Sequence, residues 1–361
     1  MESGFGYYNT TVTNNYTTMD PELAHNLSMF SYSEALAMNI IIGVLCVVGI
    51  ASNAITFAVI ASSPRLNKMA FNIFLMGLMA SDLASAVDSI FIIYRMTYGA
   101  ASYGLPLFIC KITVTVDFTT TIATIHLVMV FCILRLLSIK YPLKISVYLT
   151  SKVAKICVIV LWIESALVMS VFYFIIVSIK SAVERKSTGF SCAIADEWAS
   201  LAELYRSIAF PFVVYIPMIV IILCTIIIII TLLKRPRIRK SRIGRHSSHS
   251  TSKSNMSNEK VATLQVSLIL LSFFFGYGPF LGYSWIVLKK MAAGSKFSSR
   301  ENWLLAVWTF VALRISECVN PLFYNLSSSK LRRATKQFFR RGFTKRTATA
   351  SPSIKTISER R

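Results

Sequence analysis

Residues 208–233 read IAFPFVVYIPMIVIILCTIIIIITLL, without one charged side chain. A helix needs about 20 apolar residues to cross the hydrocarbon core of a bilayer, which is roughly 30 Å thick. Six further apolar windows of sufficient length lie at residues 36–60, 71–94, 109–137, 153–177, 261–288 and 303–324. The sequence therefore predicts an all-α membrane protein, a bundle of seven transmembrane helices.

The composition also favours a membrane setting. Hydrophobic residues make up 55% of the 361 residues, charged residues only 15%, and the mean hydropathy is +0.60. Soluble domains have about 45–50% apolar and about 25% charged residues. The formal charge of +22 lies in the connections between the windows, so it does not form the basic domain that a nucleic-acid-binding protein needs.

The basic residues gather on one side of a seven-span chain. Of the 38 Lys and Arg residues, 26 lie around residues 65–68, 140–155 and 234–260 or after Asn325. The positive-inside rule makes that side cytoplasmic and the N-terminus extracellular. We expect a multi-pass plasma-membrane protein with an extracellular tail at 1–34, a seven-helix domain at 35–326 and a cytoplasmic segment at 327–361.

The N-terminal tail carries no Lys or Arg and no charged segment before an apolar core, so we expect no cleaved signal peptide. Its three sequons predict glycosylation at Asn9, Asn15 and Asn26. Five of the seven cysteines lie well inside windows, and Cys110 stands at the outer end of the window 109–137. Only Cys110 and Cys192 face the predicted oxidising side, so we expect a disulfide between them, the alternative being two free thiols.

Each window also carries a short landmark. These are GIASN at 49–53, LMASD at 78–82, LRL at 134–136, Trp162, Pro217, GYGP at 276–279 and NPLFY at 320–324. With these landmarks in register on seven helices, the chain resembles the rhodopsin-like (class A) G protein-coupled receptors from end to end. The resemblance implies a receptor, not an enzyme, that couples an extracellular stimulus to heterotrimeric G proteins, with arrestin and receptor kinases as further partners.

Several residues are then expected to act in activation. Pro279 and Pro321 each remove a backbone hydrogen bond inside a spanning helix and so create a hinge. The resemblance implies that the G protein binds near Arg135, Pro142 and Tyr324, at the inner ends of the helices.

The resemblance also implies an ion pair between Arg135 and Glu259 that holds the bundle closed. The acidic residue that the family places before this arginine is Leu134 here. We therefore hypothesise that Glu259 maintains the closed state largely alone and that basal signalling is raised.

Ionisable residues within the windows predict an interior functional cluster, because each costs about 2.5–3.5 kcal/mol at the centre of an isolated membrane helix. They are Asp82, Asp88, Asp117, Arg314 and Glu317. By resemblance, Asp82, Thr124, Ser316 and Asn320 match the family's sodium-binding positions, with Glu317 as an additional carboxylate. Sodium is thus a hypothesis; no cofactor is required, and no other metal site is expected, since His126 is the only histidine within a window.

We expect the ligand pocket to be lined by Asp117, Arg314, Tyr277, Phe280 and Phe310. Asp117 stands where amine receptors bind the ligand ammonium, so an amine receptor is one alternative. Another is a peptide, lipid or other small-molecule ligand whose carboxylate binds Arg314. A third is an internal salt bridge between Asp117 and Arg314 that involves no ligand.

Arg314 also stands where opsins carry the lysine that binds retinal. A guanidinium remains protonated and cannot condense with an aldehyde as a lysine amine does, which argues against covalent retinal. The opsin-like alternative is therefore a sensor that does not bind retinal covalently. A channel or transporter is a more distant alternative, since it would need polar residues along the whole bundle rather than in one central layer.

The segment after the seventh window predicts a short amphipathic cytoplasmic helix. Residues 330–343 place Leu331, Ala334, Phe338 and Phe339 among six basic residues. Such a helix lies with its apolar face in an anionic leaflet, which makes membrane lipid a further partner.

Overall fold

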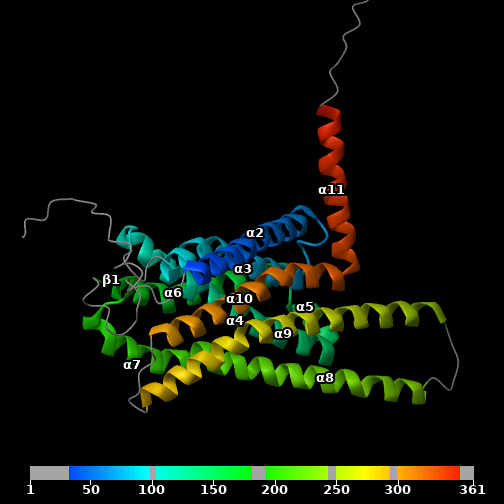
Figure 1. The fold of residues 1–361 in the computed structure, drawn as a ribbon. Helices are drawn as coiled ribbons and strands as arrows, with labels where there is room; N and C mark the ends of the chain where they lie inside the picture. The colour runs from blue at the N-terminus through cyan, green and yellow to red at the C-terminus, as the bar shows by residue number, and fades with distance from the viewer. Residues whose placement is uncertain (1–31, 98–102, 181–191, 243–248, 293–298, 350–361) are drawn as a thin grey trace, which may run out of the picture.

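A computed structural model describes residues 32–97, 103–180, 192–242, 249–292 and 299–349. Within these residues, seven helical segments are long and apolar enough to cross a membrane. They match the seven predicted windows and form a single bundle (Figure 1), which confirms the predicted fold class.

The helices and strands follow one another as a seven-span chain with short additional elements. The long helices are α2 (Tyr32–Ser62), α3 (Ala70–Thr97), α4 (Leu107–Lys140), α6 (Ser151–Ile176), α8 (Ile216–Arg242), α9 (His249–Ala292) and α10 (Ser299–Ser327). The shorter elements are α5 (Pro142–Tyr148), β1 (Val177–Ile179), β2 (Cys192–Ile194), η1 (Asp196–Trp198), α7 (Ala199–Phe210), η2 (Pro211–Tyr215) and α11 (Ser329–Thr349).

The fifth span begins earlier than the hydropathy predicts. Its apolar window starts at residue 208, whereas the candidate span runs over Asp196–Thr231 and includes α7 and the π-helical turn η2. Residues 199–210 contain Ala, Leu and Glu, which are strong helix formers although they are less apolar than the window. Hydropathy therefore marks only the most apolar part of this span.

The basic connection expected at 234–260 is also largely helical. α8 continues to Arg242 and α9 begins at His249. Lys and Arg favour helix nearly as well as Leu does, so a change from apolar to basic residues does not end a helix. Figure 1 shows α8 and α9 extending beyond the other bundle helices at the end from which α11 departs.

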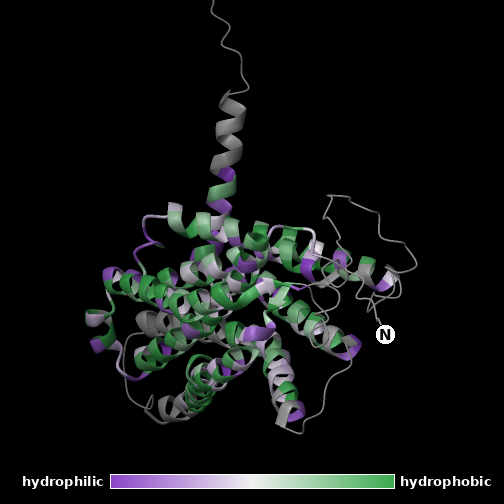
Figure 2. Ribbon diagram, turned by 90° about the vertical axis from the view of Figure 1, so that its left-hand side faces the viewer, coloured by the Kyte–Doolittle hydropathy of each residue, from purple (hydrophilic) through white to green (hydrophobic). Residues whose placement is uncertain are grey.

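The centre of the bundle is formed by α3, α4 and α10, which have more buried positions than the peripheral α6. α4 contacts α3, α6 and α8, while α10 contacts α9, α2 and α3. Hydrophobic residues cover most of the bundle helices in Figure 2, and many hydrophilic residues lie at the helix ends. This distribution is the one expected for helices surrounded by lipid.

The amphipathic segment forms α11, which is longer than the predicted 330–343 and runs across the direction of the bundle helices (Figure 1). Leu331 is buried against the bundle, whereas Phe338 and Phe339 remain exposed. One apolar side chain of α11 thus packs against the bundle, and two face the surroundings. Contact of this helix with lipid stays a prediction.

Candidate functional site

Arg314 is the centre of a buried ion cluster. Its Nη1 donates to Glu317 Oε2 at 2.5 Å, and its Nη2 donates to Asp117 Oδ1 at 3.2 Å. The guanidinium carbon also lies 4.4 Å from the centre of the Phe310 ring, a cation–π contact. The internal salt bridge between Asp117 and Arg314, one of the predicted alternatives, is therefore present and joins α4 to α10.

Glu317 connects this cluster to α3 and α2. Ser85 Oγ lies 3.1 Å from each carboxylate oxygen of Glu317 and donates to this carboxylate. The Asn53 side-chain amide donates to the backbone carbonyl of Glu317 at 3.3 Å. Arg314 and Glu317 are three residues apart and share one face of α10, which permits their contact. Arg314 therefore pairs with Glu317, the additional carboxylate expected beside the sodium-binding positions, as well as with Asp117.

The predicted sodium residues are only partly brought together. The Asn320 amide donates to Asp82 Oδ2 at 3.1 Å. Thr124 Oγ1 instead donates to Ser81 Oγ at 2.8 Å, and Ser316 Oγ donates to the Ser272 carbonyl at 2.6 Å. In the described part of the chain, Asp82 Oδ1 and Asn320 Oδ1 are buried acceptors without a donor. Two such oxygens on paired side chains fit a small cation.

Of the aromatic residues expected in the pocket, Phe310 contacts Arg314, while Tyr277 and Phe280 contact each other. Tyr277 is buried and stacks on Phe273 with ring centres 4.4 Å apart, and the edge contact to Phe280 spans 6.5 Å. Asp117 is the accessible member of its ion pair, with a side chain 30% exposed, against 4% for Arg314. A molecule that reaches this pair would meet the carboxylate first.

The disulfide predicted between Cys110 and Cys192 is present and joins the start of α4 to β2. β2 pairs in antiparallel fashion with β1, at the end of the bundle opposite α11 (Figure 1). Arg95 Nε donates to the Cys192 carbonyl at 2.8 Å and so holds the same strand to α3. Near this strand, burial raises the pKa of the Tyr103 hydroxyl, and the positive charge of Arg95 opposes that shift.

A second pair of ionisable residues was missed by the sequence reasoning. His126 Nδ1 lies 2.7 Å from Glu164 Oε2, and His126 Nε2 donates to the Val213 carbonyl at 3.1 Å. The pair therefore joins α4, α6 and the π-helical turn η2. Glu164 is the only acidic residue in the window 153–177, so a scan of every window for ionisable residues would have found it.

The residues expected to act in activation lie on helices as predicted, but their contacts are less fully described. Arg135 is half-buried on α4, and Pro142 opens α5. Glu259 lies on α9, and its side chain is outside the described residues, so its ion pair with Arg135 stays a prediction.

Some of the remaining predicted positions lie on described helices, and others lie outside the described residues. Pro279 and Pro321 lie inside α9 and α10, and Tyr324 is buried near the end of α10. The sequons at Asn9, Asn15 and Asn26 lie outside the described residues.

Comparison with known proteins points to one family. A family model described as "7 transmembrane receptor (rhodopsin family)" matches residues 52–324. The chain is 25% identical to somatostatin receptor type 2 of Mus musculus over 81% of this chain and 73% of that receptor.

Two further relatives bear other ligand names. The chain is 26% identical to the platelet-activating factor receptor of Cavia porcellus, over 62% of this chain and 63% of that receptor. It is 24% identical to growth hormone secretagogue receptor type 1 of Sus scrofa, over 80% of this chain and 76% of that receptor. Because the family model covers more than half of the chain, the protein belongs to the rhodopsin-like G protein-coupled receptors, which pass an extracellular stimulus to heterotrimeric G proteins and are not enzymes.

Proposed function

We propose that the receptor responds to an extracellular ligand with a basic group, an amine or a basic side chain of a peptide, which binds Asp117. The observation that carries this proposal is the unequal exposure of the ion pair, in which Asp117 is accessible and Arg314 is covered. Asp117 and Glu317 together also outnumber the single charge of Arg314, and an excess of negative charge attracts a cation.

Binding of a cation to Asp117 would weaken its attraction to Arg314. The tie between α4 and α10 would loosen, and α10 could move about Pro321, which lies seven residues beyond Arg314. The ligand can shift the population toward the open state only by its difference in affinity for the two states. The open state would bind the G protein near Arg135.

The test is a second-messenger assay in cells with a panel of amines, basic peptides and their uncharged analogues. Asp117→Asn should lower the potency of an active basic ligand about 30-fold or more, since loss of one partner of a buried charge pair costs about 2–5 kcal/mol. Glu164→Gln is the matched control, because it removes another carboxylate within the spans and should leave the potency unchanged. An uncharged analogue of equal potency would contradict the proposal.

A second candidate is a ligand that presents a carboxylate to Arg314. It is favoured by Arg314 Nε, a buried donor with no acceptor in the described part of the chain. For an acidic agonist, Arg314→Lys should retain part of the response and Arg314→Gln should abolish it. The three relatives are named for three different ligands, so their names do not choose between these candidates.

The opsin-like alternative has its own discriminating assay. Cells that express the receptor are read in light and darkness, with and without added retinal. A light response that requires retinal would support non-covalent retinal binding and would contradict both ligand candidates.

Sodium binding at Asp82 and Asn320 is supported by their two unsatisfied oxygens. Sodium that stabilises the closed state should weaken agonist binding, and Asp82→Asn should remove this effect. Replacement of sodium by a large organic cation at constant ionic strength separates specific binding from screening.

The expected topology and partners belong to the same proposal. The N-terminus is extracellular at the plasma membrane with glycans on Asn9, Asn15 and Asn26, and arrestin, receptor kinases and anionic lipid act on the cytoplasmic side. Surface labelling of an N-terminal epitope and a glycosidase mobility shift lost in the triple Asn→Gln variant test the topology.

A further inference from the structure

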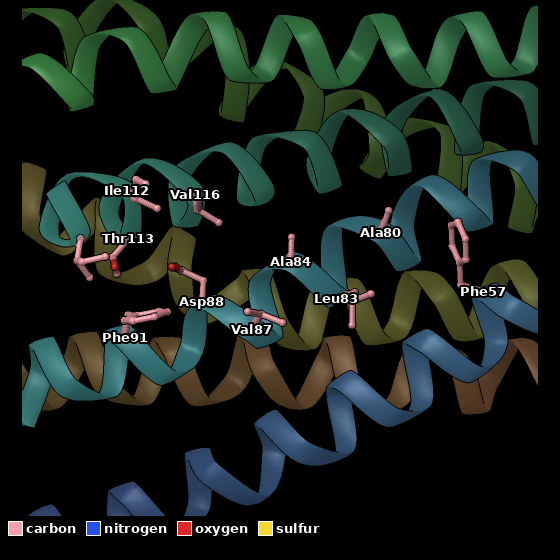
Figure 3. A pocket seen from close by; sticks show the side chains of 11 residues that line it. Phe57, Ala80, Leu83, Ala84, Val87, Asp88, Phe91, Ile112, Thr113 and Val116 are labelled. Carbon is pink, nitrogen blue, oxygen red and sulfur yellow. The ribbon is translucent and has the colours of Figure 1, made fainter.

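A groove of about 550 Å³ lies between α3 and α4, and Asp117, Arg314 and Glu317 do not belong to its lining. Its lining includes Leu83, Val87 and Phe91 of α3 and Ile112 and Val116 of α4 (Figure 3). Val87 is 45% exposed and lies within a span, so the groove reaches the surface of the bundle that faces lipid. The volume is within the range of about 300–1,000 Å³ that is usual for ligand pockets.

Only two lining residues are polar, and both lie toward one end of the groove. Figure 3 shows the Asp88 carboxylate and the Thr113 hydroxyl in the space between the helices. Asp88 is 5% exposed and Thr113 is fully buried. Within the described residues, Asp88 Oδ2 accepts no hydrogen bond, and Thr113 Oγ1 has none apart from an interaction with the Tyr103 hydroxyl. A buried carboxylate oxygen without a donor is costly in an apolar setting, so Asp88 Oδ2 would gain from a donor that enters the groove.

We propose that this groove binds a membrane-dissolved amphiphile with a primary ammonium group, whose nitrogen donates to Asp88 Oδ2 and Thr113 Oγ1. An ammonium provides three donors and the opposite charge. A quaternary ammonium has no N–H to donate, and an alcohol leaves the carboxylate charge without compensation. The polar end determines the selectivity, because lipid tails already solvate the apolar body as well as the groove does.

This site is distinct from the proposed ligand site. Asp117 does not line the groove and is bound to Arg314, whereas Asp88 lies on α3 and faces the groove. The amphiphile would reach Asp88 laterally from the bilayer. Asp117→Asn tests the ligand site and leaves the groove intact, whereas Asp88→Asn tests the groove and leaves Asp117 intact. A negative result for one proposal can therefore be told apart from a negative result for the other.

The test uses the full-length receptor in phosphatidylcholine nanodiscs and a hexadecylamine that carries a diazirine and an alkyne. Matched probes have a trimethylammonium or a hydroxyl head. The amine should label residues 83–91 and 109–116 at lower concentration than both matched probes. Asp88→Asn should raise its half-saturating concentration about 30-fold or more, and Glu164→Gln should leave it unchanged.

Two further measurements keep the proposal falsifiable if Asp88→Asn folds poorly. Ala84→Phe fills the groove and should abolish labelling while Asp88 is retained. In the absence of probe, Asp88→Asn should raise the thermal stability, because it removes the charge of a buried carboxylate whose Oδ2 accepts no hydrogen bond. Equal labelling by the alcohol or the quaternary probe, competition by cholesterol at the same concentration, or unchanged labelling in both variants would overturn the proposal.

Discussion

Arg314 Nη2 lies 3.2 Å from Asp117 Oδ1, and this ion pair joins two helices whose residues are 197 positions apart in the chain. The same guanidinium is bound to Glu317. The relative position of α4 and α10 therefore depends on one buried cation between two carboxylates. Loss of that cation and loss of one carboxylate should have different consequences.

Arg314→Met should destabilise the receptor by about 3–5 kcal/mol, because it leaves the buried Glu317 and the partly exposed Asp117 without their partner. Thermal unfolding of the purified receptor measures the effect. Arg300→Met is the matched control, since Arg300 forms an exposed ion pair with Glu34 that is worth about 0–1 kcal/mol. Combining Arg314→Met with Asp117→Asn and Glu317→Gln should recover much of the loss. Equal melting temperatures for the two single variants would show that the buried cluster does not support the fold.

Basal signalling tests the role assigned to Glu259. If Glu259 maintains the closed state in place of the acidic residue that Leu134 replaces, Glu259→Ala should raise ligand-free second-messenger levels. Leu134→Asp should lower them, because it supplies Arg135 with an adjacent carboxylate. Signals are normalised to receptor at the cell surface. Unchanged levels in both variants would refute this role.

The pair formed by His126 and Glu164 should be energetically coupled. His126 is bound at both ring nitrogens, to Glu164 and to the Val213 carbonyl, so it joins three spans. In a double-mutant cycle of His126→Leu and Glu164→Leu, contacting residues of this kind have coupling free energies of about 0.5–3 kcal/mol. Thermal or denaturant unfolding of the four proteins measures the coupling. Additive single effects would mean that the two side chains stabilise the bundle independently.

The sequence predicted the seven spans well, because the thickness of the bilayer imposes a minimum length on each apolar run. It predicted less well the limits of the fifth span and of helix α9, which contains the sixth span. Residues 196–207 and 249–260 are helical without being strongly apolar, so hydropathy does not mark them. The disulfide was predictable because only two cysteines faced the same side.

The interior charges were predicted as a cluster, because isolated charges in a membrane are costly. The pairing of Asp117 with Arg314 was among the predicted alternatives, but the partners of Glu317 were not predictable in the same way. Glu317 could have joined Asp82 at a cation site, yet its side chain is bound to Arg314 and Ser85. Which partner Glu317 binds depends on helix rotation and on side-chain rotamers, and a pattern of residue types contains neither. Ser85 was missed because it belongs to no recognised motif, whereas Glu164 is ionisable and lies within a window, so the criterion that selected Asp82 would also have selected it.

The contact between α9 and α10 at Gly276 should tolerate no side chain. A Cβ added to Gly276 would lie 2.6 Å from Ser316 Cβ. A Cβ added to Gly278 would have no atom within 4 Å. Gly276→Ala should therefore separate the helices, weaken the Ser272–Ser316 hydrogen bonds and cost about 1–3 kcal/mol, as overpacking usually does.

Gly278→Ala is the matched control, with the same change of side chain on the same helix. It should be neutral or stabilise the receptor by up to about 1 kcal/mol, since Ala favours helix over Gly. Melting temperatures of the two purified variants give the comparison. Because Gly276 lies three residues before the hinge at Pro279, separation of α9 from α10 should also change ligand-free signalling in Gly276→Ala alone. Similar melting temperatures of the two variants would mean that α9 and α10 can move apart at no cost. Similar basal signals would mean that their close approach at Gly276 does not restrain activation.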